Sequence, residues 1–253
     1  MKVGIPTEIK TDEYRVAITP VGVREFSQLG HEVLIQKGAG EGSAIEDSHY
    51  VAQGARIVPD ADAVFDEAEL ILKVKEPLAE EVERLRPGHV LFTYLHLAPA
   101  PELTKGLCDS GATCIAYETV EDERGALPLL APMSEVAGRL AAQVAASTLA
   151  SDGAARGVLM GGVPGVAPAR VLVIGGGVAG TSAARVAVGM GAEVVVLDRS
   201  LRRLRELEVE FGRLVTTRFA SSLAIEELLP EADAVIGTVL VRGARAPHVV
   251  RRE

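Results

Sequence analysis

The sequence predicts an α/β protein built from two parallel-sheet domains. Three observations support this prediction: short apolar segments alternate with helical ones, the composition changes near Pro132, and a glycine-rich turn follows an apolar run at residues 170–174. Strands that alternate with helices form parallel βαβ units. We therefore expect two doubly wound domains, residues 1–132 and 133–253, connected through a long helix at the start of the second.

The first half opens with an apolar segment at residues 2–6, which predicts a strand. Thr19 and Pro20 begin a helix, because threonine is a good N-cap and proline suits the first helical position. Gly30 ends this helix. The later elements of this half are less distinct: we expect strands at residues 31–35, 70–74, 89–95 and 114–117, and a charged helix at residues 79–85.

The second half opens with a long helix, for which Ser134 is the predicted N-cap. Val136, Leu140 and Val144 recur every four residues and give the helix an apolar face that reaches about residue 151. Small residues between them would let another backbone pack closely. A Gly/Pro-rich loop at residues 157–168 follows, and then come strands at 170–174, 193–197 and 234–240 and helices at 181–190 and 201–211.

The strongest motif is a G-x-G-x-x-G turn, formed by Gly175, Gly177 and Gly180 around Val178 and Ala179. The first glycine permits a tight turn, the second lets the backbone approach a pyrophosphate, and the third lets the helix pack against the strand. A diphosphate would then bind the N–H groups at the start of the helix. The alternative is a purely structural glycine turn.

Asp198 supports the prediction of a dinucleotide-binding site, because it ends the next predicted strand, 18 residues beyond Gly180. A carboxylate near this spacing binds the ribose hydroxyls in Rossmann dinucleotide-binding domains. It also favours NAD over NADP, since a 2′-phosphate would meet its charge. Arg199, Arg202 and Arg203 weaken that preference; most of them would form a solvated helix face, although one, such as Arg203, can contact the adenosine phosphate or ribose.

The first half offers three candidate site residues. Arg15 lies in a polar loop, where a fixed guanidinium can grip a carboxylate through two hydrogen bonds. Lys75 and His96 each follow a predicted strand, at the edge where open α/β sheets bind ligands. A histidine at that edge is suited to proton transfer. Taken singly, each of the three is more often structural than functional.

Composition excludes several classes of protein. The net charge of -9, the pI of about 5.2 and the 4% aromatic content argue against a nucleic-acid partner. Cys108 and Cys114 form neither a disulfide framework nor a zinc motif, and the histidines show no pairing that suggests a metal. The chain has no signal peptide and no apolar run long enough for a membrane span, so we expect a cytoplasmic protein.

Several segments resemble bacterial alanine dehydrogenases, in the same order and over essentially the whole chain. They are RVAITP at residues 15–20, KVKEP at 73–77, FTYLHLA at 92–98, PMSEVAGR at 132–139 and GVLMGGVPGV at 157–166. The resemblance implies reversible oxidative deamination of L-alanine to pyruvate and ammonia with NAD. It also implies a homohexamer, and a cleft between the two domains that holds the substrate Cα against the nicotinamide.

The resemblance assigns roles to individual residues. Arg15 would bind the substrate carboxylate, Lys75 would hydrogen-bond the substrate and assist catalysis, and His96 would exchange protons with the amine or the carbinolamine. The remaining matched positions would contact the cofactor: Ser134 near the hinge, Asp198 at the adenine ribose, Ser221 beside the adenosine, and Val239 and Leu240 along the cleft.

Members of this family continue past residue 253, into a strand that ends in an aspartate, the catalytic partner of His96. The resemblance therefore implies a fragment or a shortened relative whose second sheet lacks its last strands. Two alternatives stay open: the NAD(H)-binding subunit of a proton-translocating transhydrogenase, and a non-catalytic NAD(H)-binding remnant. The segment at residues 133–139 follows the dehydrogenases more closely than the transhydrogenases.

Overall fold

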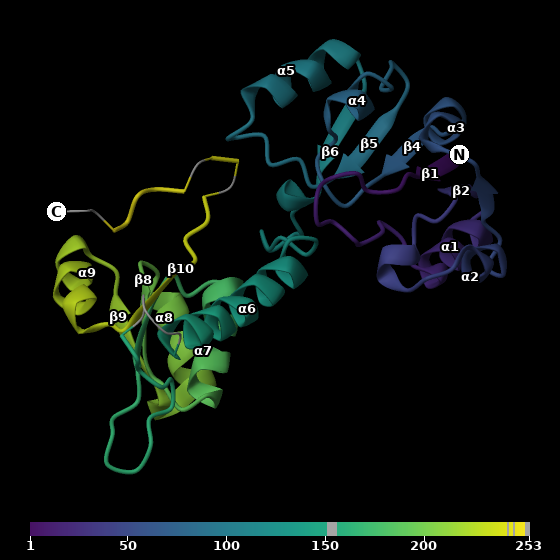
Figure 1. Ribbon diagram of the computed structural model, residues 1–253. Helices are drawn as coiled ribbons and strands as arrows, with labels where there is room; N and C mark the ends of the chain where they lie inside the picture. The colour runs from purple at the N-terminus through teal and green to yellow at the C-terminus, as the bar shows by residue number, and fades with distance from the viewer. Residues whose placement is uncertain (151–155, 242, 245, 251–253) are drawn as a thin grey trace. The chain divides into compact units, whose positions relative to one another are not determined.

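The computed structural model describes residues 1–150, 156–241, 243–244 and 246–250. The chain divides into two compact units, Met1–Gly125 and Ala126–Glu253. Each unit is built on a parallel sheet with helices on both faces (Figure 1), so the predicted fold class is confirmed. Among the described residues, no helix is both long enough and apolar enough to cross a membrane.

The sheet of the first unit has six parallel strands in the order β3-β2-β1-β4-β5-β6. The strand order therefore reverses between β1 and β4, and ligands of open α/β sheets bind at such a reversal, beyond the carboxyl ends of the strands. The strands are β1 (Lys2–Ile5), β2 (Glu32–Gln36), β3 (Arg56–Val58), β4 (Leu70–Leu72), β5 (Val90–Thr93) and β6 (Thr113–Ala116).

Two apolar clusters bury the faces of this sheet. Val23 and Tyr50 bring α1 (Pro20–Gln28) and α2 (Asp47–Val51) onto one face. The other face receives α3 (Ala61–Glu67), α4 (Ala79–Val82) and α5 (Pro101–Ser110). Short 3-10 turns, η1 (Glu41–Ser43) and η2 (Tyr117–Thr119), complete the unit.

The predicted elements of the first unit are present, with shifted ends. Helix α1 begins at Pro20 after Thr19, as expected, although the Thr19 side chain makes no capping hydrogen bond. Helix α4 is shorter than the predicted 79–85 segment. Strand β3 and helices α2, α3 and α5 were not predicted, because short elements carry too few apolar residues to show a period.

The second unit has four parallel strands in the order β10-β7-β8-β9. Three helices pack on one face of this sheet, and α9 packs on the other. The strands are β7 (Arg170–Ile174), β8 (Glu193–Asp198), β9 (Val215–Phe219) and β10 (Ala234–Gly237). The helices are α6 (Ala131–Ala150), α7 (Val178–Gly189), α8 (Leu201–Phe211) and α9 (Ser222–Leu228), with 3-10 turns η3 (Gly212–Leu214) and η4 (Leu229–Glu231).

Helix α6 corrects two expectations. It begins at Ala131, so Ser134 is not its N-cap: the Ser134 N–H already donates to the Leu130 carbonyl at 3.0 Å. Pro132 is tolerated because the first turn of a helix needs no N–H donor from it. The sequence signal at Ser134 was therefore one turn late.

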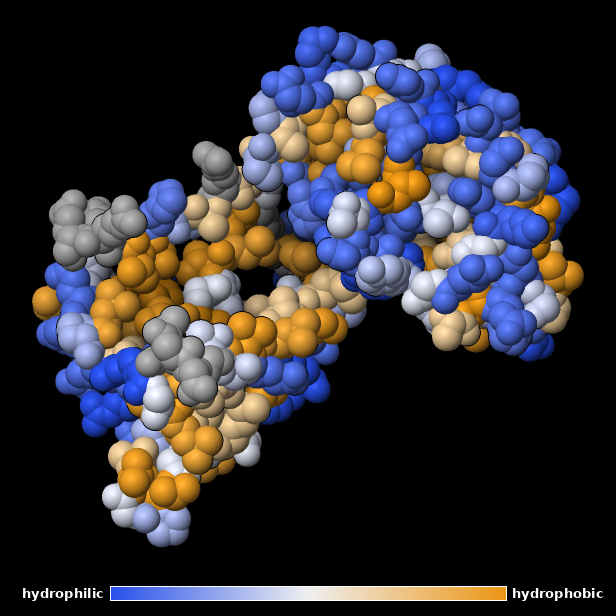
Figure 2. Space-filling model, viewed as in Figure 1, coloured by the Kyte–Doolittle hydropathy of each residue, from blue (hydrophilic) through white to orange (hydrophobic). Residues whose placement is uncertain are grey.

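The apolar face predicted for α6 is not the face through which the helix packs. Val136, Leu140 and Val144 are 49%, 52% and 61% exposed, and Figure 2 shows apolar side chains along this helix. Helix α6 instead packs through a stripe of mostly small residues, of which Gly138 and Ala142 are fully buried or nearly so. The spacing of large apolar residues did not reveal this face, because here close backbone approach replaces side-chain burial.

The small residues of α6 predicted that another backbone would pack closely against this helix, and α7 does so. A Cβ placed on Gly138 would lie 2.0 Å from the Ala179 carbonyl oxygen, far inside van der Waals contact. Since that neighbour is backbone, it cannot move aside without shifting α7. The first turn of α7, which carries the glycine motif, is therefore held by α6.

We predict that Gly138→Ala lowers the free energy of unfolding by about 1–3 kcal/mol, the usual effect of overpacking a tight contact. Gly189→Ala is the matched control, because it lies in α7 and a Cβ there would meet nothing within 4 Å. This control should be neutral or stabilising by about 0.5–1 kcal/mol. Urea denaturation of both variants measures the difference; equal stability would contradict the tight contact.

Candidate functional site

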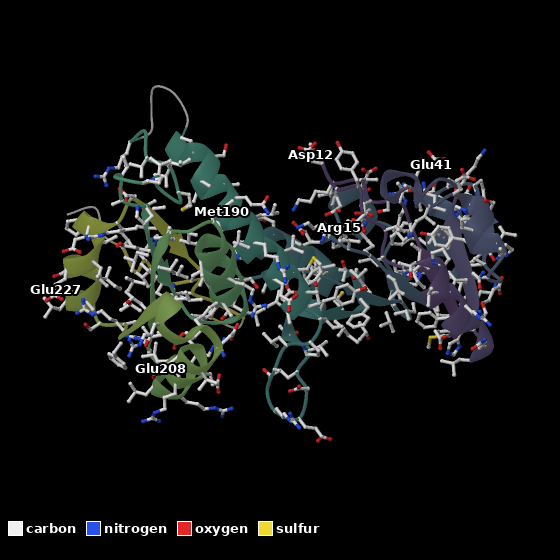
Figure 3. All side chains as sticks on the ribbon, turned by 90° about the horizontal axis from the view of Figure 1, so that it is seen from below. Asp12, Arg15, Glu41, Met190, Glu208 and Glu227 are labelled. Carbon is white, nitrogen blue, oxygen red and sulfur yellow. The ribbon has the colours of Figure 1, made fainter. Side chains whose placement is uncertain are left out.

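The three candidate residues of the first unit lie beyond the carboxyl ends of neighbouring strands, and a fourth side chain follows the next strand in the sheet. Arg15 lies on the loop that follows β1, and Figure 3 shows it on that loop, as it does Asp12. Lys75 follows β4, His96 follows β5, and Glu118 follows β6. Because all these strands are parallel, the loops meet at one edge of the sheet.

A buried ion cluster stabilises the chain that leads to Lys75. Lys73 is fully buried, and its Nζ lies 3.1 Å from Glu8 Oε2 and 2.7 Å from Glu81 Oε1. Both carboxylates are themselves almost inaccessible. Burial raises the pKa of Glu81, and the neighbouring ammonium only partly offsets the shift. A buried charge is tolerated only when it is paired and hydrogen-bonded, so these three side chains form one unit.

Glu8 also ties the loop after β1 to the end of β4. Its carboxylate accepts the N–H of Val74 at 2.6 Å and that of Lys75 at 3.3 Å. On the other side, the Thr93 hydroxyl donates to the Lys75 carbonyl at 2.9 Å. The backbone of Lys75 is thus held from two neighbouring strand ends, while its half-buried side chain lies at the sheet edge.

Arg15 is held by its neighbour Glu13. Its Nε donates to Glu13 Oε1 at 2.8 Å, and its Nη2 donates to Oε2 at 2.6 Å, a bidentate pair. This hydrogen bonding raises the pKa of Arg15 and lowers that of Glu13. Electrostatic interaction with Tyr94 adds to the rise in the pKa of Arg15, and the charge of Lys75 adds to the fall in the pKa of Glu13. Arg15, Lys75 and the segment before His96 therefore share one electrostatic environment.

His96 has an unusual backbone. Its φ is +48°, in the left-handed region, and its side chain is about half exposed. The imidazole stacks on the Tyr94 ring with a centroid separation of 6.0 Å and an interplanar angle of 10°. The carboxylate of Glu76 pairs with Lys10. Burial opposes ionisation of Glu76, but the hydrogen bond from Lys10 and the charges of Lys10 and His96 lower its pKa overall. The structure thus places an imidazole, an ammonium and a guanidinium at one edge.

The glycine motif of the second unit has the predicted geometry. Gly175 adopts φ +105°, which only glycine takes up readily. A Cβ on Gly180 would lie 1.8 Å from the Gly175 carbonyl oxygen, so the helix packs against the turn as expected. A Cβ on Gly177 would meet nothing within 4 Å. This open backbone at the start of α7 is suited to a pyrophosphate.

Asp198 ends β8, next to the glycine turn. Its Oδ2 accepts the N–H of Gly176 at 2.8 Å, and its Oδ1 accepts that of Ser200 at 2.7 Å. An ionised carboxylate has about four acceptor positions, so two remain for ribose hydroxyls. The side chain that would bind the ribose is therefore also held against the turn that would bind the diphosphate.

Arg203 braces the glycine turn. Its Nε donates to the Gly176 carbonyl at 2.6 Å, and its Nη2 donates to the Thr181 hydroxyl at 2.7 Å. Its Nη1 pairs with Glu206 at 2.8 Å. All three nitrogens of the guanidinium thus bind protein groups. Arg203 therefore stabilises the turn, in addition to the cofactor contact expected from the sequence.

The other predicted cofactor contacts lie in different settings. Ser221 follows β9 and caps α9, accepting the N–H of Ala224 at 3.1 Å. Val239 and Leu240 follow β10, so they share the carboxyl edge with the glycine turn. Ser134 lies inside the first turns of α6, the helix that packs on α7.

Sequence reasoning missed several residues that organise these edges: Glu8, Glu13, Glu81, Glu118 and Thr238. Thr238 donates to the Gly175 carbonyl at 2.7 Å and restricts the space around Gly175 and Gly180. Their shared signal is weak, since a single carboxylate or hydroxyl in a loop or on a short helix looks like any surface residue. Only their partners in the folded chain distinguish them.

Comparisons with known proteins assign both halves of the chain to one family. Residues 4–137 match the N-terminal domain of the alanine dehydrogenase/PNT family, and residues 141–253 match its C-terminal domain. The alanine dehydrogenase of Mycolicibacterium smegmatis is 62% identical over 250 residues, which cover 99% of this chain and 67% of the relative. The chain thus spans about two thirds of the length of its curated relatives.

Two solved structures extend the comparison. An L-alanine dehydrogenase superposes with a TM-score of 0.89 at 48% identity, covering 99% of this chain and 69% of that structure. A transhydrogenase from Sinorhizobium meliloti superposes with a TM-score of 0.81 at 30% identity, covering 100% of this chain and 74% of that structure. With both family domains matched in order, the chain belongs to the alanine dehydrogenase/PNT family.

Proposed function

We propose that this chain carries out the NAD-dependent, reversible oxidative deamination of L-alanine to pyruvate and ammonia. The observation that carries the proposal is the gathering of Arg15, Lys75 and His96 at one sheet edge, in a chain 62% identical to an alanine dehydrogenase. The greater likeness to dehydrogenases than to the transhydrogenase favours this activity over transhydrogenation. The homohexamer and the cytoplasmic location stay predictions.

In the proposed reaction, alanine, NAD⁺ and water give pyruvate, ammonium, NADH and a proton. Arg15 binds the substrate carboxylate. In doing so its guanidinium either releases Glu13, its present partner, or binds both carboxylates at once. Lys75 donates a hydrogen bond to the substrate oxygen or nitrogen, since a lysine ammonium is a donor only. His96 takes one proton from the substrate ammonium group and releases it to solvent, then takes a second proton from the attacking water and delivers it to the amine that leaves as ammonia.

The second unit would hold NAD. Its diphosphate would lie over Gly177, where the backbone is open, and its adenine ribose would hydrogen-bond to Asp198. Ser134, Val178, Ala179, Arg203, Ser221, Val239 and Leu240 are the further proposed contacts. When bound, NAD accepts the hydride from the substrate Cα; the protein binds, orients and moves protons around that transfer.

The first test is NADH oxidation by the 253-residue chain at saturating pyruvate and ammonium. We expect oxidation that depends on both substrates and ceases when ammonium is omitted. NADH binding measured by fluorescence, with no ammonium-dependent oxidation, would overturn the proposal and leave a cofactor-binding protein. Oxidation at equal rates without ammonium would point to a different acceptor reaction.

His96→Ala should lower kcat/KM by ~10²–10⁴, the usual contribution of a positioned acid/base. His31→Ala is the matched control, because His31 lies next to the amino end of β2 and so at the opposite edge of the sheet. It should keep the wild-type rate. Steady-state kinetics with varied pyruvate measures both variants, and a near-normal rate in His96→Ala would remove this side chain from proton transfer.

Asp198→Gly should raise the NADPH-to-NADH ratio of kcat/KM, because the 2′-phosphate would no longer face a carboxylate. A tenfold rise corresponds to about 1.4 kcal/mol of relieved repulsion. Glu193→Gly is the control, since it removes a carboxylate from the other end of the same strand. An unchanged ratio in Asp198→Gly would show that the nearby arginines or the backbone set the cofactor preference.

A further inference from the structure

His96 is one of three non-glycine residues with positive φ among the described residues, and the one with a proposed catalytic role. The left-handed conformation is unfavourable for an L-residue, because its Cβ crowds the following carbonyl oxygen. Such a conformation persists only where surrounding contacts determine it. The contact that does so here comes from the neighbouring strand.

Glu118 supplies that contact. Its Oε1 accepts the His96 N–H at 2.6 Å, and both carboxylate oxygens lie 3.2 Å from the Leu95 nitrogen. Two successive amides beside a left-handed residue form a small concavity that binds anions. Here the concavity is filled by a carboxylate of the same chain, whose charge strengthens both hydrogen bonds.

The topology explains why Glu118 reaches this point. Strands β5 and β6 are paired in parallel, with Thr93 opposite Ala116 at their carboxyl ends. Glu118 lies in η2 directly after β6, and His96 lies three residues past the end of β5. Carboxylate and amides thus meet across neighbouring strand ends, and the Glu118 side chain is only 18% exposed.

An aromatic cluster fixes the ring once the backbone is set. Tyr94 stacks on the imidazole, and Tyr117 packs edge-on against Tyr94 at 5.1 Å and against Phe92 at 4.3 Å. Burial raises the pKa of both tyrosines, so they stay neutral near neutral pH. The Glu118 oxygen is 4.0 Å from the imidazole Nδ1, beyond hydrogen-bond distance, so its contact is with the backbone.

We propose that Glu118 is a positioning residue, which holds the His96 backbone in the left-handed conformation and so stacks the imidazole on Tyr94 at the substrate edge. The inference rests on the proposed function for the role of His96, but the positioning itself is independent of activity. Losing the carboxylate would let the backbone relax to negative φ and turn the ring away from Tyr94.

The test compares Glu118→Leu, which keeps the bulk but no acceptor, with Glu118→Gln, which keeps an oxygen for the amides without the charge. Glu69→Leu is the control: Glu69 also accepts a backbone N–H, that of Lys2 at 2.7 Å, but at the opposite sheet edge. The readout is the contact between the His96 and Tyr94 rings, seen as nuclear Overhauser effects. With five histidines in the chain, His96→Ala assigns the resonance by its loss.

We expect the ring contact to be lost in Glu118→Leu, retained in Glu118→Gln and unchanged in Glu69→Leu. If the ring contact is lost in Glu118→Leu but retained in Glu118→Gln, an oxygen acceptor for the two amides is what holds His96, and the negative charge is not required. A retained contact in Glu118→Leu would overturn the proposal. If Glu118→Leu does not fold, Glu118→Asp takes its place, because its shorter side chain cannot reach both amides: loss of the ring contact supports the proposal, and an unchanged contact overturns it.

Kinetics gives a second readout. Glu118→Leu should lower kcat by ~10–10², because displacement of a catalytic group by about 1 Å can cost that much, while KM for pyruvate changes far less. Glu118→Gln should restore most of the rate. If the wild-type chain shows no ammonium-dependent oxidation, the proposed function fails, but the ring contact still decides whether Glu118 positions His96.

Discussion

Parallel strand pairing is the constraint on which both units depend. It places every strand's carboxyl end at the same edge of its sheet, so residues far apart in the sequence meet there. The ladder extends one residue past β4, β5 and β7, where Lys73, Tyr94 and Gly175 still donate to a neighbouring segment of the sheet, and the amides that follow have no ladder partner. Those amides must find other acceptors or bind water.

The same solution recurs at three strand ends. Glu8, after β1, accepts the amides that follow β4; Glu118, after β6, accepts those that follow β5; and Asp198, at the end of β8, accepts the amide that follows β7. In each case the carboxylate comes from a neighbouring strand. The residues so held are Lys75, His96 and the glycine turn, which are among those to which the proposed reaction assigns a role.

Close packing has the corresponding role in the second unit. Gly138 brings α6 against the first turn of α7, and Gly180 brings that turn against Gly175, with no room for a Cβ at either place. Gly177 alone in this region faces open space. The turn is therefore closely packed on its protein side and open on the other, a geometry suited to presenting backbone N–H groups to an anion.

The sequence by itself determined the fold class, the glycine turn and the order of the longer elements, because periodicity and motif spacing are local properties. It also singled out Arg15, Lys75 and His96 by residue type and position after a strand, with roles that the family resemblance supplied. Tertiary structure alone decided which face of α6 is buried, since a small-residue stripe has meaning only against its partner helix. It alone identified Glu8, Glu81 and Glu118, because a carboxylate's task depends on amides and ammonium groups that only the folded chain brings within hydrogen-bond distance.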